Sequence, residues 1–112
     1  MAGKQVGVTI RKYINLLRKN NIDVHEAILF GSHASGHARE DSDIDVAIIS
    51  PDLGKDRIEE MVTLKRLAEQ IDYDISPRPY SLEQYRNARR GDFLHDEIIR
   101  KGKVVPKTED AR

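Results

Sequence analysis

Two aspartates separated by a single residue are the strongest sign of chemistry in this chain of 112 residues. Asp43 and Asp45 lie where an alternating pattern leads into an apolar run that ends at Ile49, which is typical of a β-strand. Side chains two apart on a strand share a face, with Cα atoms about 7 Å apart at a rise of roughly 3.3 Å per residue. Two such carboxylates repel each other unless a cation lies between them, and oxygen ligands favour Mg²⁺ or Mn²⁺. The pair therefore predicts a divalent-cation site.

A second polar segment precedes the aspartates. Gly31 and Ser32 directly follow a short apolar run, residues 27–30. Glycine allows the backbone to turn sharply at the end of a strand, and the serine hydroxyl lies beside backbone N–H groups near the expected start of a short helix. Such a corner favours phosphate oxygens.

Asp72 and Asp74 offer a third carboxylate. Both alternate with apolar and aromatic side chains, which predicts a strand with the two acids on one side. If this strand lies beside the strand of Asp43 and Asp45, three carboxylates gather, the minimum for two metal ions acting on a phosphate. The spacing alone leaves the choice between Asp72 and Asp74 open.

Two histidines suggest a different metal chemistry. His33 and His37 are four residues apart and would share one face of a helix, as zinc ligands can. Gly36 lies between them and no third ligand follows nearby, which argues against a zinc site. The chain has no cysteine, which excludes disulfides, a thiol nucleophile and thiolate metal ligands.

The elements around these residues follow from their apolar spacing. We predict helices over residues 6–17, 58–71, 81–90 and 93–101, and strands over residues 27–30, 44–49, 71–76 and 104–105. This order predicts an α+β (α/β) fold, a small mixed sheet flanked by helices. We expect one domain over residues 1–105 and a frayed polar tail over residues 106–112.

Capping residues and prolines mark the ends of these elements. Asp56 suits the start of the second helix, and Ser81 with Gln84 suits a capping box at the start of the third. Pro77 and Pro79 should end the third strand or confine it to an edge of the sheet.

Composition narrows the functional class. The 19 Lys and Arg residues balance 19 Asp and Glu, and residues 31–60 hold three basic against eight acidic residues. An acidic middle between basic ends makes no continuous polyanion-binding stripe, so we expect no stable nucleic-acid binding. No apolar run approaches the roughly 20 residues of a membrane-spanning helix, and we expect a cytoplasmic protein without membrane contact.

The segment from Gly31 to Val46 resembles the signature of the DNA polymerase β-like nucleotidyltransferase superfamily, in particular its short, stand-alone minimal nucleotidyltransferases. Their pattern is Gly-Ser, then Ala-Arg-Gly, then Ser-Asp-x-Asp on the next strand. This chain keeps the pattern at Gly31, Ser32, Ala34, Gly36, Ser42, Asp43 and Asp45. It departs from the pattern at Ser35, where Arg is usual; Arg39 or a C-terminal basic residue is a candidate substitute.

The resemblance covers essentially the whole chain and implies the polymerase β-like fold and a metal-dependent transfer of a nucleoside monophosphate, AMP from ATP, to a hydroxyl. The implied catalytic and metal-binding residues are Asp43, Asp45 and Asp74, and the implied nucleotide-binding residues are Gly31, Ser32 and Ser42. Asp74 is favoured over Asp72 by its family-like position. The implied cofactor is Mg²⁺ or Mn²⁺, with ATP as the substrate.

The resemblance also implies a protein partner. Stand-alone members of this family are commonly paired with a small all-helical ribonuclease toxin of HEPN type, and act as its antitoxin by adenylylating it. The alternative is a catalytically weak or inactive binding module that neutralises its partner by complex formation; Ser35 supports it and the intact carboxylate set opposes it. Transfer to a small molecule would require a dimer with a shared pocket, and the sequence leaves a homodimer open.

Overall fold

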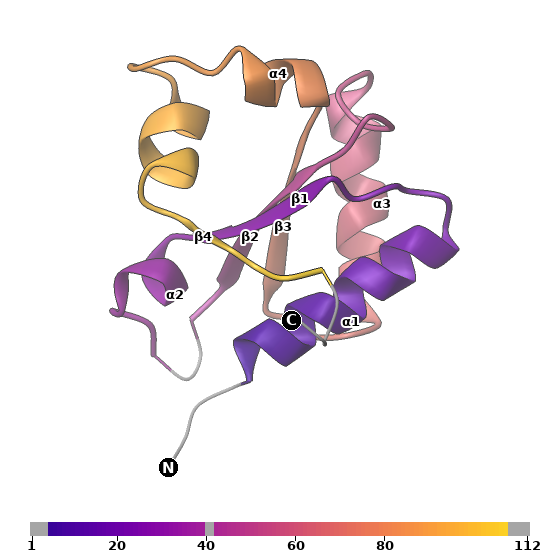
Figure 1. Ribbon diagram of the computed structural model, residues 1–112. Helices are drawn as coiled ribbons and strands as arrows, with labels where there is room; N and C mark the ends of the chain where they lie inside the picture. The colour runs from indigo at the N-terminus through magenta and orange to yellow at the C-terminus, as the bar shows by residue number, and fades with distance from the viewer. Residues whose placement is uncertain (1–4, 40–41, 108–112) are drawn as a thin grey trace.

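Four strands form one mixed sheet within residues 5–39 and 42–107, which are the residues that the computed structural model describes. The strands are β1 (Glu26–Phe30), β2 (Ile44–Ile49), β3 (Ile75–Tyr80) and β4 (Lys103–Val104), in the order β3-β2-β1-β4 across the sheet (Figure 1). β2 and β3 are parallel, whereas β1 is antiparallel to both β2 and β4. The small mixed sheet that the sequence predicts is confirmed.

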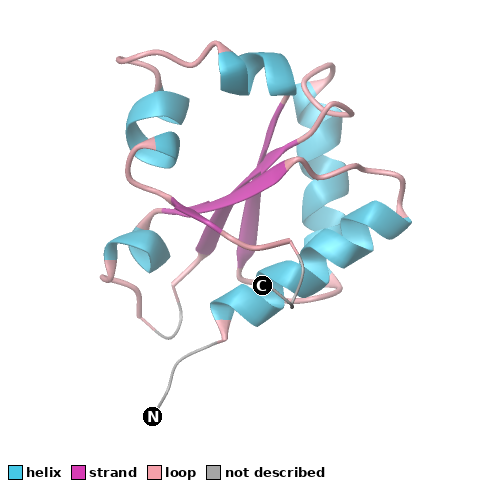
Figure 2. Cartoon of the chain, in the orientation of Figure 1, coloured by secondary structure: helices cyan, strands magenta, loops and turns pink. Residues whose placement is uncertain are grey.

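Helices cover both faces of this sheet (Figure 2). α1 (Val6–Lys19) and α3 (Arg57–Glu69) pack against one face. α4 (Leu82–Arg86) and the π-helical segment η1 (Leu94–Ile99) pack against the other, and α2 (Ser32–Ser35) directly follows β1. Within the described ranges, no helix is both long and apolar enough to cross a membrane.

Alternation along β2 divides the core into two clusters. Val46 and Ile48 pack in the larger cluster with α1 and α3. Ala47 and Ile49 pack in the smaller cluster with η1. Because side chains two apart on a strand share a face, Asp45 belongs with Ala47 and Ile49. Its carboxylate therefore projects from the face that η1 partly covers.

α1 follows its predicted amphipathic pattern. Ile10, Tyr13, Ile14 and Leu17 are all fully buried. The Tyr13 hydroxyl donates a hydrogen bond to the carbonyl oxygen of Leu64 (2.8 Å), which ties α1 to α3. Burial raises the pKa of Tyr13 above its ordinary range, so this hydroxyl keeps its proton and remains a donor.

Two of the predicted helix starts are confirmed by their caps. The side chain of Asp56 accepts a hydrogen bond from the N–H of Glu59 (3.2 Å) at the start of α3. The Ser81 hydroxyl accepts from the N–H of Gln84 (3.0 Å), and the Gln84 side chain accepts from the N–H of Ser81 (2.8 Å). This reciprocal pair is the capping box expected at the start of α4.

β3 begins later than predicted. Its first residue is Ile75, and the prediction that the strand starts at Ile71 is wrong. The N–H of Ile71 donates to the carbonyl oxygen of Ala68, and its side chain packs against the larger core cluster at the end of α3. Asp72 then accepts from the N–H of Asp74 (2.8 Å), which folds residues 72–74 into a turn. The alternation of apolar residues in the sequence begins at the end of α3 and continues into β3, so the prediction assigned both parts to one strand.

Pro77 and Pro79 lie inside β3, which is an edge strand of the sheet. The carbonyl oxygen of Tyr80 accepts from the N–H of Ser50 just beyond β2 (3.0 Å), so the even-numbered residues of β3 direct their backbone groups toward β2. The two prolines, which have no N–H to donate, face away from β2. This explains why the strand accommodates both of them.

The two C-terminal helices are shorter than predicted, and the last strand is displaced by one residue. α4 ends at Arg86 instead of residue 90, η1 spans Leu94–Ile99 instead of residues 93–101, and β4 spans Lys103–Val104 instead of residues 104–105. Within the predicted tail, the Lys107 ammonium donates to the carbonyl oxygen of His25 (2.8 Å). Residues 108–112 of that tail lie outside the described residues.

Candidate functional site

Asp45 lies near the start of β2, between its two neighbouring strands. Its cross-strand partners are Phe30 on β1 and Ser76 on β3, and its side chain is half-buried. Burial raises the pKa of Asp45 above its ordinary value, and the negative charge of Asp43 raises it further. The structure therefore brings the predicted pair of carboxylates into one electrostatic site. Asp43, the residue before β2, is exposed.

Two other side chains act in the opposite direction on the pKa of Asp45. His33 from α2 and Arg78 from β3 both lower the pKa of Asp45, although burial and Asp43 prevail. His33 is half-buried, with Nε2 at 3.4 Å from the carbonyl oxygen of Ser42. The site therefore combines one carboxylate pair with a histidine from α2 and an arginine from β3.

Gly31 closes the site on the side of β1. Its φ of +74° lies in the left-handed region that favours glycine. A Cβ atom at this position would also overlap the carboxylate oxygen Oδ2 of Asp45. Its carbonyl oxygen accepts from the N–H groups of Ala34 and Ser35 (both 3.1 Å), which starts α2 with Ser32 as its first residue. Gly31 is thus required both for the turn and for the approach of Asp45.

Ser42 has a structural role in the loop that leads to Asp43. Its hydroxyl accepts from the N–H of Arg39 (2.7 Å), and its own N–H donates to the carbonyl oxygen of Arg39 (3.1 Å). Residues 40 and 41 lie outside the described residues. The two hydrogen bonds between Arg39 and Ser42 position the chain immediately before the first aspartate.

Asp74 lies beside the aspartate pair, because the parallel pairing of β2 and β3 brings their first residues together. The N–H of Ile44 donates to the carbonyl oxygen of Asp74 (2.7 Å), so the backbone at Asp74 adjoins the backbone between Asp43 and Ile44. Asp72 has a different environment: its carboxylate accepts from the N–H of Asp74 and stabilises the turn before β3. The two candidates that the spacing left open therefore differ in their contacts, and the choice of Asp74 stays a prediction.

The donor set fits a hard divalent cation. Among the described residues, no three His, Asp or Glu side chains are grouped closely enough to hold a metal ion by themselves. Mg²⁺ commonly binds through one or two carboxylates together with substrate phosphates, and the coupled pair of Asp43 and Asp45 meets that requirement. The histidines do not form the helical pair of a zinc site: α2 ends at Ser35, and Nδ1 of His37 contacts the Ser35 hydroxyl (3.0 Å).

Arg78 is the site residue that the sequence analysis did not find. It shares a face of β3 with Ser76, the cross-strand partner of Asp45. The signal that could have revealed it is the alternation of the polar residues 74, 76 and 78 with Ile75, Pro77 and Pro79. That signal has meaning only if the strand pairs beside β2.

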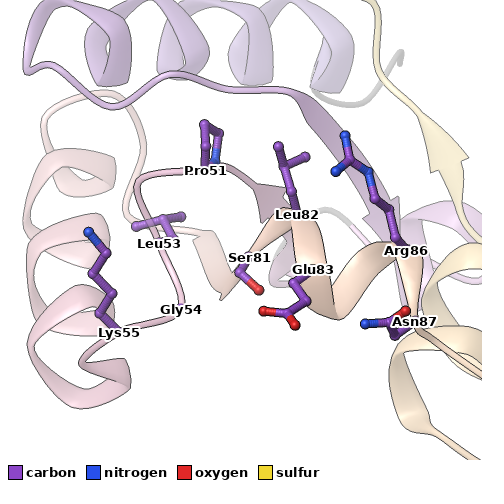
Figure 3. Close-up of a pocket in the computed structure, with 9 residues that line it drawn as sticks. All are labelled: Pro51, Leu53, Gly54, Lys55, Ser81, Leu82, Glu83, Arg86 and Asn87. Carbon is purple, nitrogen blue, oxygen red and sulfur yellow. The ribbon is translucent and has the colours of Figure 1, made fainter.

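A pocket of about 590 Å³ lies at the opposite end of the sheet (Figure 3). The segments that line it, including Pro51, Lys55 and Ser81, follow the last residues of β2 and β3. Asp43 and Asp74 directly precede the first residues of the same two parallel strands, and Asp45 is the second residue of β2. The pocket is therefore separate from the candidate site.

Comparison with known families assigns this fold and site to a class. The family model described as "Polymerase beta, Nucleotidyltransferase" matches residues 11–111, almost the whole chain. The chain therefore belongs to the polymerase β nucleotidyltransferase family. Among curated proteins, no match was found.

Solved structures place the chain next to toxin-antitoxin complexes. A toxin-antitoxin structure with AMP-PNP is 27% identical, with a TM-score of 0.61, over 92% of this chain and 74% of that one. A mutant of the MntA-HpeT toxin-antitoxin complex is 28% identical, with a TM-score of 0.60, over 89% and 73%. A third match is to one chain in the structure of a tri-AMPylated Shewanella oneidensis HEPN toxin in complex with MNT antitoxin. The two chains are 25% identical, with a TM-score of 0.58, over 93% of this chain and 74% of that one.

Proposed function

We propose that this protein transfers AMP from ATP to a hydroxyl group of a partner protein. The observation that carries the proposal is the convergence of three segments: the glycine turn after β1, the aspartate pair at the start of β2, and Asp74 at the start of β3. Family membership supports the reaction class, nucleotidyl transfer. The specific donor and acceptor are our proposal.

The three aspartates would hold divalent cations, Mg²⁺ or Mn²⁺, in the roles that the sequence resemblance assigns. Asp43 and Asp45 would ligate two ions and Asp74 the catalytic one. When bound, these ions neutralise charge on the triphosphate and on the attacking oxygen. Gly31 and Ser32 would hold the phosphates, and Ser42 would keep the loop before Asp43 in place through its bonds to Arg39.

In the reaction, the acceptor hydroxyl oxygen bonds to the α-phosphorus as the bond from that phosphorus to the bridging α–β oxygen breaks. Pyrophosphate leaves with the electron pair, and the hydroxyl proton passes to solvent. The protein forms no covalent intermediate, so its contribution is positioning and charge stabilisation.

A protein of HEPN type is the proposed acceptor, and toxin neutralisation the proposed role. The support is the resemblance to three toxin-antitoxin structures, one of which contains a tri-AMPylated HEPN toxin. A folded partner would present its own hydroxyl to the aspartates and bring the interface that holds it there.

A non-catalytic binding module is the second candidate function. Two observations favour it. Ser35 stands where the family pattern has Arg, and its hydroxyl donates within α2 to the carbonyl oxygen of Ser32 (3.2 Å). Among the described residues, no three-carboxylate metal cluster is preformed.

Intact-mass measurement separates the two functions. The protein is incubated with ATP, Mg²⁺ and a HEPN-type protein encoded beside it, with Asp43→Asn as the inactive control. We expect the mass of the partner to rise by one or more adenylyl units with the wild-type protein only. A stable complex without added mass would support the binding module instead.

The same assay tests the choice of the third carboxylate. We expect Asp74→Asn to abolish transfer, whereas Asp72→Asn should retain transfer and lower stability through the turn before β3. Loss of transfer in Asp72→Asn together with full transfer in Asp74→Asn would reverse the assignment.

A further inference from the structure

Arg78 lies on the edge strand β3, next to the candidate site. It lies on β3 with Ala47 of β2 as its cross-strand partner, two pairs further along the strands than the pair of Asp45 and Ser76. Its side chain is half-buried and projects from the same face as Asp45. Ala47 is fully buried and small, so the long arginine side chain has room to extend over β2.

Two aromatic side chains hold the guanidinium of Arg78. Its Nε donates a hydrogen bond to the Tyr80 hydroxyl oxygen (3.0 Å). Its Cζ lies 4.6 Å from the centroid of the Phe93 ring, a cation–π contact. Phe93 in turn packs edge-to-face against Phe30, with ring centroids 6.0 Å apart. Because Tyr80 engages Nε, the two Nη groups remain available as the outer donors of the fork.

These contacts place a fixed positive charge beside the carboxylates. Phe30 is the cross-strand partner of Asp45, so the cluster of Arg78, Phe93 and Phe30 borders the aspartate directly. Arg78 also lowers the pKa of Asp45, as a cation close to a carboxylate does. Within the described part of the chain, Arg78 nevertheless forms no ion pair with a carboxylate.

The order of the strands determines where the Arg78 guanidinium lies relative to Gly31 and Ser32, the other proposed phosphate-binding residues. β2 lies between β1 and β3 (Figure 1). Gly31 and Ser32 directly follow β1 and Arg78 belongs to β3, so they flank the aspartates of β2 from opposite sides. A phosphate group above Asp43 and Asp45 would lie between them. Arginine donors match phosphate oxygens in charge and in planar geometry.

We propose that Arg78 is a phosphate-binding residue of this site, which donates from Nη to the nucleotide, and that Tyr80 and Phe93 are the residues that position it. The inference rests on the proposed nucleotide-binding function and adds a residue from β3 to it. It also supplies a positive charge to a site that has serine at position 35.

The test measures binding of α,β-methylene-ATP with Mg²⁺ by isothermal titration calorimetry, which requires no acceptor. Arg78→Ala should weaken the affinity about 10- to 100-fold, the range expected for a charge-assisted hydrogen bond. Arg78→Lys should recover part of it, because lysine restores the charge without the planar fork. Arg66→Ala, an exposed arginine of α3 on the other face of the sheet, is the matched control and should bind like the wild type.

The positioning roles are tested by combining variants. Tyr80→Phe and Phe93→Leu should each weaken binding several-fold in the wild-type background. In the Arg78→Ala background they should have no further effect, because both act through the guanidinium. Equal effects in both backgrounds would show that Tyr80 and Phe93 act independently of Arg78.

The outcomes distinguish this inference from the proposed function. If the wild type does not bind the nucleotide, the proposed function fails. If the wild type binds it and folded Arg78→Ala and Arg78→Gln both bind equally well, Arg78 is no phosphate ligand. Circular dichroism establishes that each variant is folded, and Arg78→Gln, which keeps most of the side-chain volume, replaces Arg78→Ala if the latter does not fold.

Discussion

Gly31 and Gly36 flank the short helix α2 and share a positive φ, but their surroundings differ. A Cβ atom on Gly31 would overlap the Asp45 carboxylate, whereas a Cβ on Gly36 meets nothing within 4 Å. Gly36→Ala should therefore cost only the backbone strain, about 1–2 kcal/mol. Gly31→Ala should cost at least about 1 kcal/mol more, since the ψ of −150° at Gly31 belongs to a region that essentially only glycine adopts and a Cβ there also adds a steric overlap. Urea denaturation of both variants provides the comparison.

The cause of the difference can be checked with a double variant. Asp45→Ala removes the carboxylate that a Cβ on residue 31 would meet. It should return part of the lost stability to Gly31→Ala and none to Gly36→Ala. Equal losses in the two single variants would show that the contact with Asp45 has no energetic weight.

Asp45 shows the conflict between stability and function in a single residue. Burial and the neighbouring Asp43 raise its pKa, so the ionised form is unfavourable in the metal-free protein. Asp45→Asn should raise the free energy of unfolding at neutral pH by less than about 1 kcal/mol, because the site is only half-buried and solvent screens it. The same variant should abolish transfer. Lower stability of Asp45→Asn in EDTA at pH 7 would contradict the repulsion argument.

At the level of elements, the carboxylate of Glu60 stabilises the loop before α3 through hydrogen bonds. Partial burial acts to raise the pKa of Glu60, but the N–H groups of Gly54, Lys55 and Asp56 together hold it below its ordinary value. Glu60 accepts these three bonds at 2.9, 3.0 and 3.2 Å. The ionised form therefore stabilises the folded protein.

Replacement of Glu60 by Gln should lower the free energy of unfolding at pH 7 by about 1 kcal/mol, with allowance for solvent screening. A lowered pKa contributes stability above the ordinary value of 4.5, and this is lost as the pH falls through the folded-state pKa. The difference from the wild type should thus shrink below pH 4.5. Glu59→Gln, also in the first turn of α3, is the control. An unchanged difference at low pH would mean that the bonds do not depend on charge.

Local sequence patterns predicted β2 and the capped helix starts well, because alternation and caps act over a few residues. The start of β3 was missed because Ile71 is apolar for a different reason, its packing at the end of α3. The aspartate pair could be predicted from one strand alone. Arg78 could not, since its role depends on the pairing of β3 with a strand some thirty residues earlier in the chain.

At the level of the whole molecule, the proposed site is completed by its ligands. Mg²⁺ together with α,β-methylene-ATP should raise the thermal stability more than the sum of their separate effects, because the phosphates complete the coordination sphere. At a ligand concentration 100 times the dissociation constant the stabilisation should be about 2.7 kcal/mol. Differential scanning calorimetry measures it, with Asp45→Asn as the variant that should lose the synergy.

Two results would count against this picture. The first is additive stabilisation by the metal and the nucleotide in the wild type. The second is strong stabilisation by Zn²⁺ alone, which would return His33 and His37 to consideration as ligands.

The hydrogen bond from the Ile44 N–H to the carbonyl oxygen of Asp74 has a consequence for the order of folding. It joins residues separated by the whole of α3, so it forms only after a long loop closes, and such contacts are typically slow to form. The hairpin of β1 and β2 needs a shorter closure and can bring Gly31 to Asp45 earlier. A nascent chain would then form the turn at Gly31 and Ser32 and bring together the aspartate pair first. It would become competent for transfer only when the edge strand docks, and amide exchange at Ile44 would report that moment.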